Sequence, residues 1–366
     1  MYYQKVLLIT LFSLVILSGC KNDYEKAKSG SKKLVKAVLK YKDLSGVNFY
    51  KTDLTLANLQ GATLIRTRFH STKMQGVNLK EANMERANFH EANFNPAKLS
   101  TSKEADEVIS NFESANLTKA RFYKCFLIKA DLTRAKLYQA SLREAILTSA
   151  VFANANMEQV NLSEAQIKHG NFGQANLKKS TLYKADMEFS NFNGADLSKS
   201  RADNVICTNS SFRSAKMEKI NLNSSNLKHC DFTKAVMTKS NLNNCEAYKA
   251  IFKNAVLRKV NFRDANLEMC DFTNANLFMA NLREANFKNA KLENANLESA
   301  YFYDANLTNT NLTGANLKYA NFRKAYFEKT ILKNADLENA RINIRWKKFI
   351  SKSGAKNIDK IKWSTY

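Results

Sequence analysis

The chain has 366 residues and a formal net charge of +24, from 57 Lys and Arg residues against 33 Asp and Glu residues. Such a charge favours an anionic partner or surface, although it does not constrain the fold. One proline, Pro96, and ten glycines exclude a chain that makes its turns mainly with these two residues.

The N-terminus resembles a bacterial lipoprotein signal. After Lys5, an apolar run of twelve residues from Val6 to Leu17 is too short to span a bilayer but suits a signal-peptide core. The run ends in the residues LSGC, which resemble a lipobox. The resemblance implies that residues 1–19 are cleaved and that Cys20 receives a diacylglyceryl group. An uncleaved apolar anchor and an ordinary secretory signal are the alternatives.

The lipobox implies a location in the cell envelope. Two acyl chains give stable anchoring in a membrane, where one gives only marginal binding. Lys21 follows the cysteine in place of the Asp that typically retains lipoproteins in an inner membrane. The resemblance therefore favours the periplasmic side of the outer membrane if the cell is Gram-negative.

Residues 20–42 are expected to form a tether and an N-terminal cap helix. Asn, Lys, Ser and Gly dominate their first half, which predicts a flexible tether. Leu34, Val35, Val38 and Leu39 then recur at helical spacing. This spacing predicts a short helix near residues 31–42 that covers the open end of the domain that follows.

Most of the remaining chain repeats with a period of five, which neither a helix nor a strand has. From Phe112 to Ile342, 44 of 47 positions in steps of five hold Leu, Phe, Met or Ile. The residue two positions earlier is small, most often Ala, and the preceding residue is often Asn or Asp. An earlier block in a different register runs from Leu44 to Leu99.

This A-(D/N)-L-x-x pattern resembles the pentapeptide repeat family. The resemblance implies that residues 43–342 form an all-β solenoid, a right-handed quadrilateral β-helix with four five-residue faces in each coil of twenty residues. The large and the small residue point inward and the other three point outward. From Phe152 to Phe272 a Phe recurs every twenty residues, as a stacked column requires. About fifteen coils, ~4.8 Å apart, make a rod on the order of 70 Å long. Short helical N- and C-terminal caps are expected at its open ends.

Residues 100–111 interrupt the repeat. Leu99 and Phe112 are thirteen residues apart in place of ten, which predicts a three-residue insertion that bulges as a loop from one continuous rod. Two rods hinged at this point are the alternative. Glu104, Asp106 and Glu107 make the segment acidic, as either a solvated loop or a docking point.

The repeat register places five cysteines in the core. Four take the small inward position and Cys207 takes the large one, so we expect buried thiols with no obligatory disulfide. The four that replace Ala are Cys125, Cys230, Cys245 and Cys270.

The histidines take outward positions. His70 and His90 are one coil apart on the same face, but without an evident third ligand we predict no metal site; the others are His169 and His229. The sequence contains no Ser-His-Asp, HExxH, phosphate-loop or CxxC pattern. Because a packed rod offers no cleft, we expect neither catalysis nor a cofactor.

One outward column is rich in lysine. On one face, five successive coils carry a lysine two residues after the large inward residue: Lys179, Lys199, Lys219, Lys239 and Lys259. This lysine column would be about 19 Å long at the parallel-strand spacing. Lys178 and Arg258 flank it, Lys119 lies on the same column nearer the N-terminus, and Glu218 offsets part of its charge. It is either an anion-binding stripe or a solvated Lys-rich face.

Residues 343–366 depart from the repeat. Trp346, Phe349 and Ile350 take helical spacing among basic residues, which predicts a basic C-terminal cap helix or tail. A basic amphipathic surface for a membrane or a second subunit is the alternative. Related proteins often dimerise through such ends, so the resemblance implies a homodimer as one assembly.

The sequence as a whole favours a non-catalytic, lipid-anchored binding or scaffold rod of the bacterial cell envelope. Its expected partners are the membrane, through Cys20, and an anionic lipid, lipopolysaccharide or glycan, through the lysine column. A purely structural envelope protein and an accessory protein that binds a protein partner through its faces are the alternatives. Some pentapeptide repeat proteins bind DNA topoisomerases as acidic mimics of duplex DNA. This chain has the opposite charge, so neither that activity nor binding of nucleic acid is expected.

Overall fold

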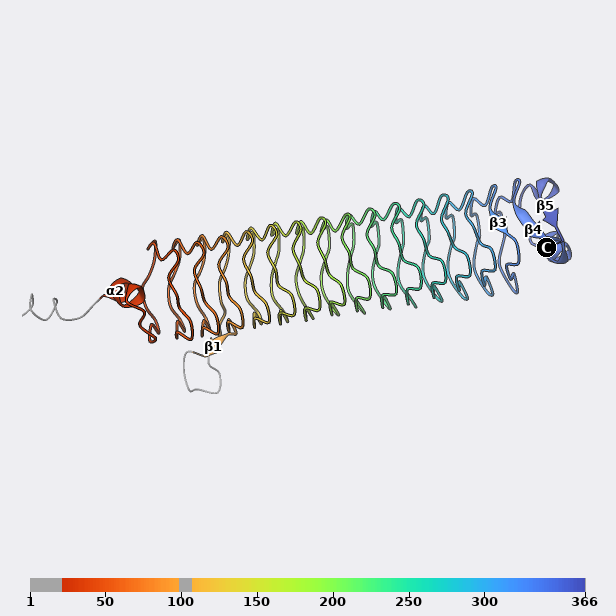
Figure 1. Ribbon diagram of the computed structural model, residues 1–366. Coiled ribbons are helices and arrows are strands. Elements are labelled where there is room, and N and C mark those ends of the chain that lie inside the picture. Colours follow the sequence, from red (N-terminus) through yellow and green to blue (C-terminus); the bar gives the residue numbers. More distant parts are fainter. Residues whose placement is uncertain (1–21, 99–106, 366) are drawn as a thin grey trace, which may run out of the picture.

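The protein is a long, straight tube of stacked coils (Figure 1). The computed structural model describes residues 22–98 and 107–365, with the side chains of 98 and 107 left out. The expected signal peptide, Cys20 and most of the expected loop lie outside the described residues. Within the described part of the chain, no helix is both long enough and apolar enough to cross a bilayer.

Each pentapeptide is a short extended piece followed by a turn. The turn is closed by a hydrogen bond from the next small residue to the large one, as from Ala185 N to Leu182 O at 2.9 Å. The second turn residue is left-handed, with a φ of 56° at Lys184. Asn or Asp before the large residue supports this turn, because its side chain accepts a hydrogen bond from a backbone N–H two residues on. Asn176 Oδ1, for example, accepts from Lys178 N at 3.2 Å.

Successive coils pair in parallel with a register of twenty residues. Asn171 pairs with Asn191, and Asn191 with Ser211. The backbone N–H of Phe192 donates to Ser211 O at 2.7 Å. The predicted column of rings is present, since the centroids of Phe192 and Phe212 are 5.0 Å apart and their planes differ by 4°. The predicted fold class, a right-handed quadrilateral β-helix, is confirmed.

The first coil begins earlier than the sequence analysis predicted. A helix over residues 31–42 is wrong, because Leu34 and Leu39 are buried inward residues of the repeat. Their pentapeptides pair with the coil that follows, since Leu34 N donates to Asp53 O at 2.8 Å. The first helix of the described residues is α2, Asp23–Lys28, whose Ala27 is buried in the core. Over so short a stretch, the apolar residues fit a helical spacing as well as a five-residue spacing. The chain adopts the five-residue repeat because pairing with the next coil satisfies its backbone N–H and C=O groups.

The insertion is larger than predicted. Asn78 pairs with Asn111, a register of 33 residues in place of 20, so thirteen residues are looped out and not three. They leave and rejoin the tube through an antiparallel pair, β1 Ala97–Lys98 and β2 Glu107–Val108. Phe89 stacks on Phe122 with centroids 4.7 Å apart. The coils therefore pack across the insertion as one rod, without a hinge.

The count of coils agrees with the prediction. The inward residues from Leu34 to Phe94 make thirteen faces and those from Phe112 to Ile342 make forty-seven, and all of them are buried. At four faces a coil this amounts to fifteen coils. Even the small inward residues at these positions, such as Ala202 and Cys207, are at most 1% exposed.

The C-terminal segment covers the last coil with short helices and a strand. Its elements are η1 Ile344–Trp346, α3 Lys347–Ile350, η2 Ile358–Lys360 and β5 Lys362–Ser364; they follow β4 Arg341–Asn343 of the last coil, which pairs with β3 Asn321–Phe322 of the coil before it. Strands β3, β4 and β5 pair in parallel, so β5 extends the stack by part of a coil. The Trp346 ring lies 5.7 Å from Phe327, and its Nε1 donates to Ala325 O at 3.0 Å. Ile350 is buried in the core cluster.

Both ends of the described core are covered by the chain itself. The core cluster begins at Ala27 in α2 and ends at Ile361, before β5. We therefore expect a chain that begins at Asn22 to fold.

Replacing a core ring should destabilise the rod far more than replacing a surface ring. Phe212 is 1% exposed between two stacked neighbours, whereas Phe189 is 50% exposed. Phe212→Ala should lower the free energy of unfolding by about 3–5 kcal/mol, and Phe189→Ala by less than about 1 kcal/mol. Urea unfolding followed by circular dichroism measures both, and equal losses would contradict the assigned register.

Candidate anion-binding surface

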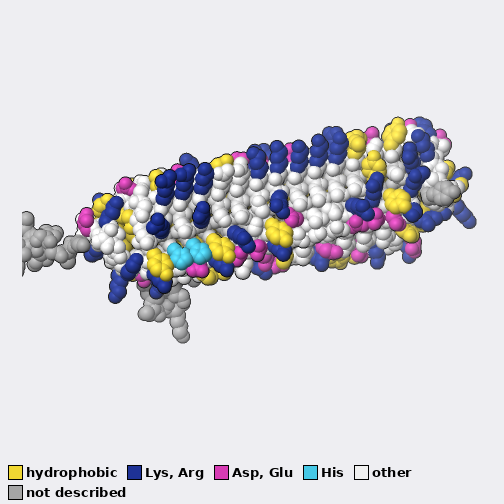
Figure 2. All heavy atoms as spheres, in the orientation of Figure 1, with side chains coloured by type: hydrophobic (Ala, Val, Ile, Leu, Met, Phe, Trp, Pro, Cys, Tyr) yellow, Lys and Arg dark blue, Asp and Glu magenta, His cyan; other side chains and the backbone are white. Residues whose placement is uncertain are grey.

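The lysine column lies along one edge of the rod. Its residues occupy the left-handed turn position on successive coils, with φ values from 55° at Lys179 to 62° at Lys199. The column is continuous because each coil pairs with the next, as where Lys199 N donates to Glu218 O at 2.8 Å. Figure 2 shows dark blue side chains in regular rows along this side of the tube.

The column is longer than the sequence analysis recognised. Because thirteen residues are looped out, Arg86 lies one coil before Lys119 in the same turn position, and Arg86 N donates to Thr118 O at 2.9 Å. Arg66 precedes Arg86 by one further coil. Only Gln139 and Gln159 interrupt the series of basic residues up to Lys259.

We call this series the cationic edge. Its members are Arg66, Arg86, Lys119, Lys179, Lys199, Lys219, Lys239 and Lys259. The edge covers ten coils and is about 43 Å long at ~4.8 Å a coil.

The predicted anion-binding residues differ in whether a neighbouring side chain already binds their charge. Lys179 Nζ lies 3.4 Å from Glu158 Oε1, and Lys178 Nζ lies 3.2 Å from Asp196 Oδ2. The Arg258 guanidinium stacks 5.3 Å from the Phe278 ring. Among the residues that the structure describes, no carboxylate lies within 4.0 Å of the other four lysines of the column. The unpaired charge is therefore centred on Lys199, Lys219, Lys239 and Lys259.

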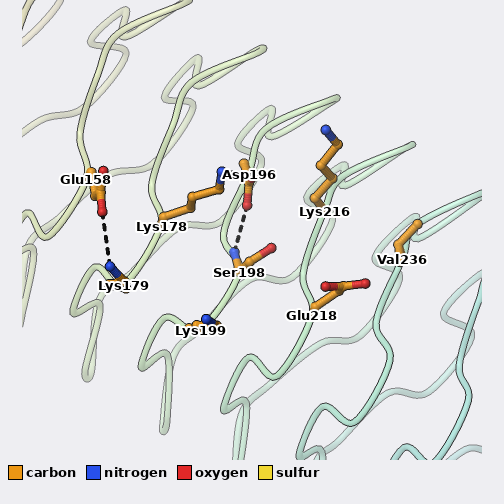
Figure 3. A pocket seen from close by; sticks show the side chains of 9 residues that line it. All are labelled: Glu158, Lys178, Lys179, Asp196, Ser198, Lys199, Lys216, Glu218 and Val236. Atoms are coloured by element: carbon orange, nitrogen blue, oxygen red, sulfur yellow. Dashed lines mark hydrogen bonds and ion pairs between the residues drawn. The ribbon is translucent and has the colours of Figure 1, made fainter.

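A shallow hollow adjoins the start of the lysine column (Figure 3). Its volume is about 550 Å³, and small Ser198 lies between longer side chains on the neighbouring coils. In Figure 3, Lys179 reaches Glu158, while Lys178 extends toward Asp196. The remaining charged residues that line it are Lys199, Lys216 and Glu218. The hollow thus contains both signs of charge and does not form a purely cationic pocket.

Asp196 stays ionised in this hollow. Burial by itself would raise the pKa of Asp196, but hydrogen bonds from Ser198 and the ion pair with Lys178 hold it below its ordinary value. The backbone N–H of Ser198 donates to Asp196 Oδ1 at 3.0 Å. Lys178 is therefore neutralised by a neighbour that keeps its charge, and it contributes little to anion binding.

The histidines occupy outward corners, as predicted, but two of them have a third neighbour that the sequence analysis missed. His70 and His90 stack with ring centroids 4.6 Å apart, and Glu91 lies within reach of both. Glu91 directly follows His90, so the signal was present in the sequence. His169 stacks on Phe189, and His229 contacts Tyr248 edge to face.

Five cysteines lie in the core as free thiols, as the repeat register predicted. Cys230 and Ser210 occupy the same small inward position on successive coils and make the same hydrogen bond. Cys230 Sγ donates to Cys207 O at 2.9 Å, and Ser210 Oγ donates to Met187 O at 2.6 Å. Burial raises the pKa of Cys230 to about 12. Cys20 lies outside the described residues.

The sequence matches a family model throughout the coils. The model for pentapeptide repeats, eight copies, matches segments that together cover residues 33–103, 110–277 and 280–343. The chain belongs to the pentapeptide repeat family. The match begins at residue 33, where the structure also places the first pentapeptide repeat. No curated protein sequence matches the chain.

Several solved structures, among them proteins described as pentapeptide repeat proteins, are similar to parts of the chain. A trypsin-treated variant of QnrB1, a plasmid-mediated fluoroquinolone resistance protein, is 14% identical over 52% of this chain and 88% of its own, with a TM-score of 0.37. Rfr23 from the cyanobacterium Cyanothece 51142 is 32% identical over 27% of this chain and 58% of its own, with a TM-score of 0.20. HetL from Nostoc sp. strain PCC 7120 is 21% identical over 76% of this chain and 88% of its own, with a TM-score of 0.15.

The thiols of the pentapeptide repeats should resist modification in the folded protein. Because burial raises the pKa of Cys230 to about 12, its reactive thiolate is scarce at pH 8 and reaches half occupancy only near that pKa. A chain that begins at Asn22 should therefore take up almost no thiol reagent at pH 8, and all five cysteines should react in denaturant. Rapid labelling of any of them in the folded state would contradict their position in the core.

Proposed function

We propose that the protein is a non-catalytic binding rod of the bacterial cell envelope. A diacylglyceryl group on Cys20 anchors it, and its cationic edge binds an anionic surface, foremost the phosphate groups of the membrane lipids beside it. The phosphates of lipopolysaccharide and acidic glycans offer the same chemistry. The observation that supports the proposal most is the run of four unpaired lysines, Lys199, Lys219, Lys239 and Lys259, along one straight edge.

The electrostatics of the edge favour an extended anionic partner. Like charges ~4.8 Å apart repel each other by somewhat less than about 1 kcal/mol in water. Phosphate groups that approach the column therefore lower its electrostatic free energy. A lysine near an anionic lipid surface contributes about 1 kcal/mol, and the contribution fades within a Debye length. A rigid rod presents its lysines together, without the entropic cost of aligning a flexible segment.

The edge also suits a rod that is tethered at its N-terminal end. The first coil follows α2 directly, and the cationic edge starts with Arg66, on the second coil that carries this face. A lipid on Cys20 would hold that end at the membrane. The basic residues would then orient the rod along the surface, so that the lipid gives attachment and the edge gives orientation.

Vesicle binding tests the cationic edge. A chain that begins at Asn22 should float with phosphatidylglycerol vesicles, should not float with phosphatidylcholine vesicles, and should be released as salt rises. Changing the five lysines of the column to Glu should weaken binding by more than about 100-fold, since about 1 kcal/mol is lost for each of four unpaired cations.

The matched control carries the same change of charge on other faces. It replaces five exposed lysines outside the edge with Glu: Lys234, Lys288, Lys291, Lys329 and Lys333. This control should retain most of the binding. Equal loss in both variants would show a response to net charge alone, and wild-type binding by the lysine-column variant would refute the proposal.

Metabolic labelling tests the anchor. Cells that express the full-length chain should incorporate labelled palmitate into it, and Cys20→Ser should abolish the label and release the protein from the membrane fraction. Cys230→Ser is the control, because serine takes the equivalent position in the same column at Ser210. Labelling that persists in Cys20→Ser would contradict the anchor.

A further inference from the structure

An outer column near the N-terminal end of the rod consists of four aromatic rings. Tyr50, His70, His90 and Tyr123 occupy the first turn position on successive coils of one face. Their centroids are 5.3, 4.6 and 5.2 Å apart, and adjacent planes differ by 12–23°. The looped-out residues are what place Tyr123 directly after His90. The two histidines are thus held between two tyrosines.

Glu91 completes a cluster with both histidines. The Nε2 atom of His70 lies 3.9 Å from Glu91 Oε2, and the Nε2 atom of His90 lies 3.6 Å from Glu91 Oε1. One ligand atom from each residue can be chosen such that all three atoms lie within 4.8 Å of one another. The three side chains are 30–48% exposed, so solvent reaches the cluster.

The carboxylate has a partner that orients it. Ser71 Oγ donates to Glu91 Oε2 at 3.2 Å from the coil that carries His70. An outer hydrogen bond of this kind is characteristic of metal-ligating carboxylates. Two lysines beside the column lie over its terminal rings, since Lys51 Nζ is 5.2 Å from the centroid of Tyr50 and Lys124 Nζ is 5.2 Å from that of Tyr123.

We propose that His70, His90 and Glu91 bind one divalent transition-metal ion, of which Zn²⁺ is the representative. The ligands would be the Nε2 atoms of both histidines and one oxygen of Glu91, and water would fill the remaining position. Two imidazoles and a carboxylate suit Zn²⁺ or Cu²⁺, whereas Mg²⁺ and Ca²⁺ prefer oxygen ligands alone.

The three ligand atoms must move closer together to hold an ion. Zn–N and Zn–O bonds of about 2.0–2.2 Å in a tetrahedral site place the ligand atoms roughly 3.3 Å apart. The Nε2 atoms of His70 and His90 lie 3.9 and 3.6 Å from different oxygens of Glu91, and one ligand atom from each residue can be chosen such that all three lie within 4.8 Å of one another. The stacked rings must tilt so that their lone pairs converge. The torsion that turns a histidine ring has a broad energy minimum, so the tilt is accessible.

Calorimetric titration of the full-length protein in detergent with Zn²⁺ tests the proposal. We expect one ion per chain, bound with micromolar affinity, and no binding heat from Mg²⁺. His70→Gln and His90→Gln should each weaken Zn²⁺ binding by at least about tenfold, because loss of even an outer-shell group costs 10–100-fold. Glu91→Gln should weaken it as well. These positions are outside the core, so the thermal melt should be unchanged.

The other two histidines provide the matched control. His169 stacks on Phe189 and His229 contacts Tyr248 edge to face, and neither belongs to the cluster. His169→Gln and His229→Gln should therefore leave Zn²⁺ binding unchanged. The buried cysteines do not compete for the ion in the folded state. Wild-type protein that does not bind Zn²⁺, or unchanged binding in His70→Gln or His90→Gln, would overturn the proposal.

Discussion

The structure depends on one constraint, the parallel pairing of each coil with the next at a register of twenty residues. A hydrogen bond such as that from Phe192 N to Ser211 O, at 2.7 Å, recurs at almost every face. Because this pairing holds the coils in alignment, a residue lies beside its counterpart twenty positions later, or 33 positions later across the insertion. The same bonds therefore arrange the interior and the surface, and a substitution that preserved them would leave every column in place.

The close spacing within a column has different effects for different side chains. Phenylalanines stack favourably inside the rod with ring centroids 4.6–5.2 Å apart, as Phe172 does on Phe192 at 4.7 Å. Asparagines outside form chains of hydrogen bonds, as from Asn281 Nδ2 to Asn261 Oδ1 at 2.8 Å. Lysines repel one another in the same arrangement, so an anion that binds along a lysine column relieves this repulsion. Two histidines at this distance can share one carboxylate, and by the same logic one cation.

Much of the fold could be predicted from the sequence, because the inward positions follow a local period. The errors arose where the period alone was ambiguous. Leu34 and Leu39 fit a helix as well as the repeat, and only pairing with the next coil distinguishes the two. The insertion was underestimated because Leu99 continues the five-residue spacing in the sequence, whereas the pairing of Asn78 with Asn111 shows that thirteen residues are looped out. That error also concealed the continuity between Arg86 and Lys119.

The sequence by itself determined the coil, the inward residues and the chemical type of each outward side chain. It could do so because burial of a large and a small residue in every five is a local requirement, readable within each pentapeptide. Only the tertiary structure decided which outward groups meet. Lys179 forms an ion pair with Glu158, whereas Lys199 has no carboxylate partner among the described residues, and Glu91 lies near two histidines. Such contacts join different coils. They depend on how many residues are looped out and on how each long side chain turns, and no five-residue pattern encodes either.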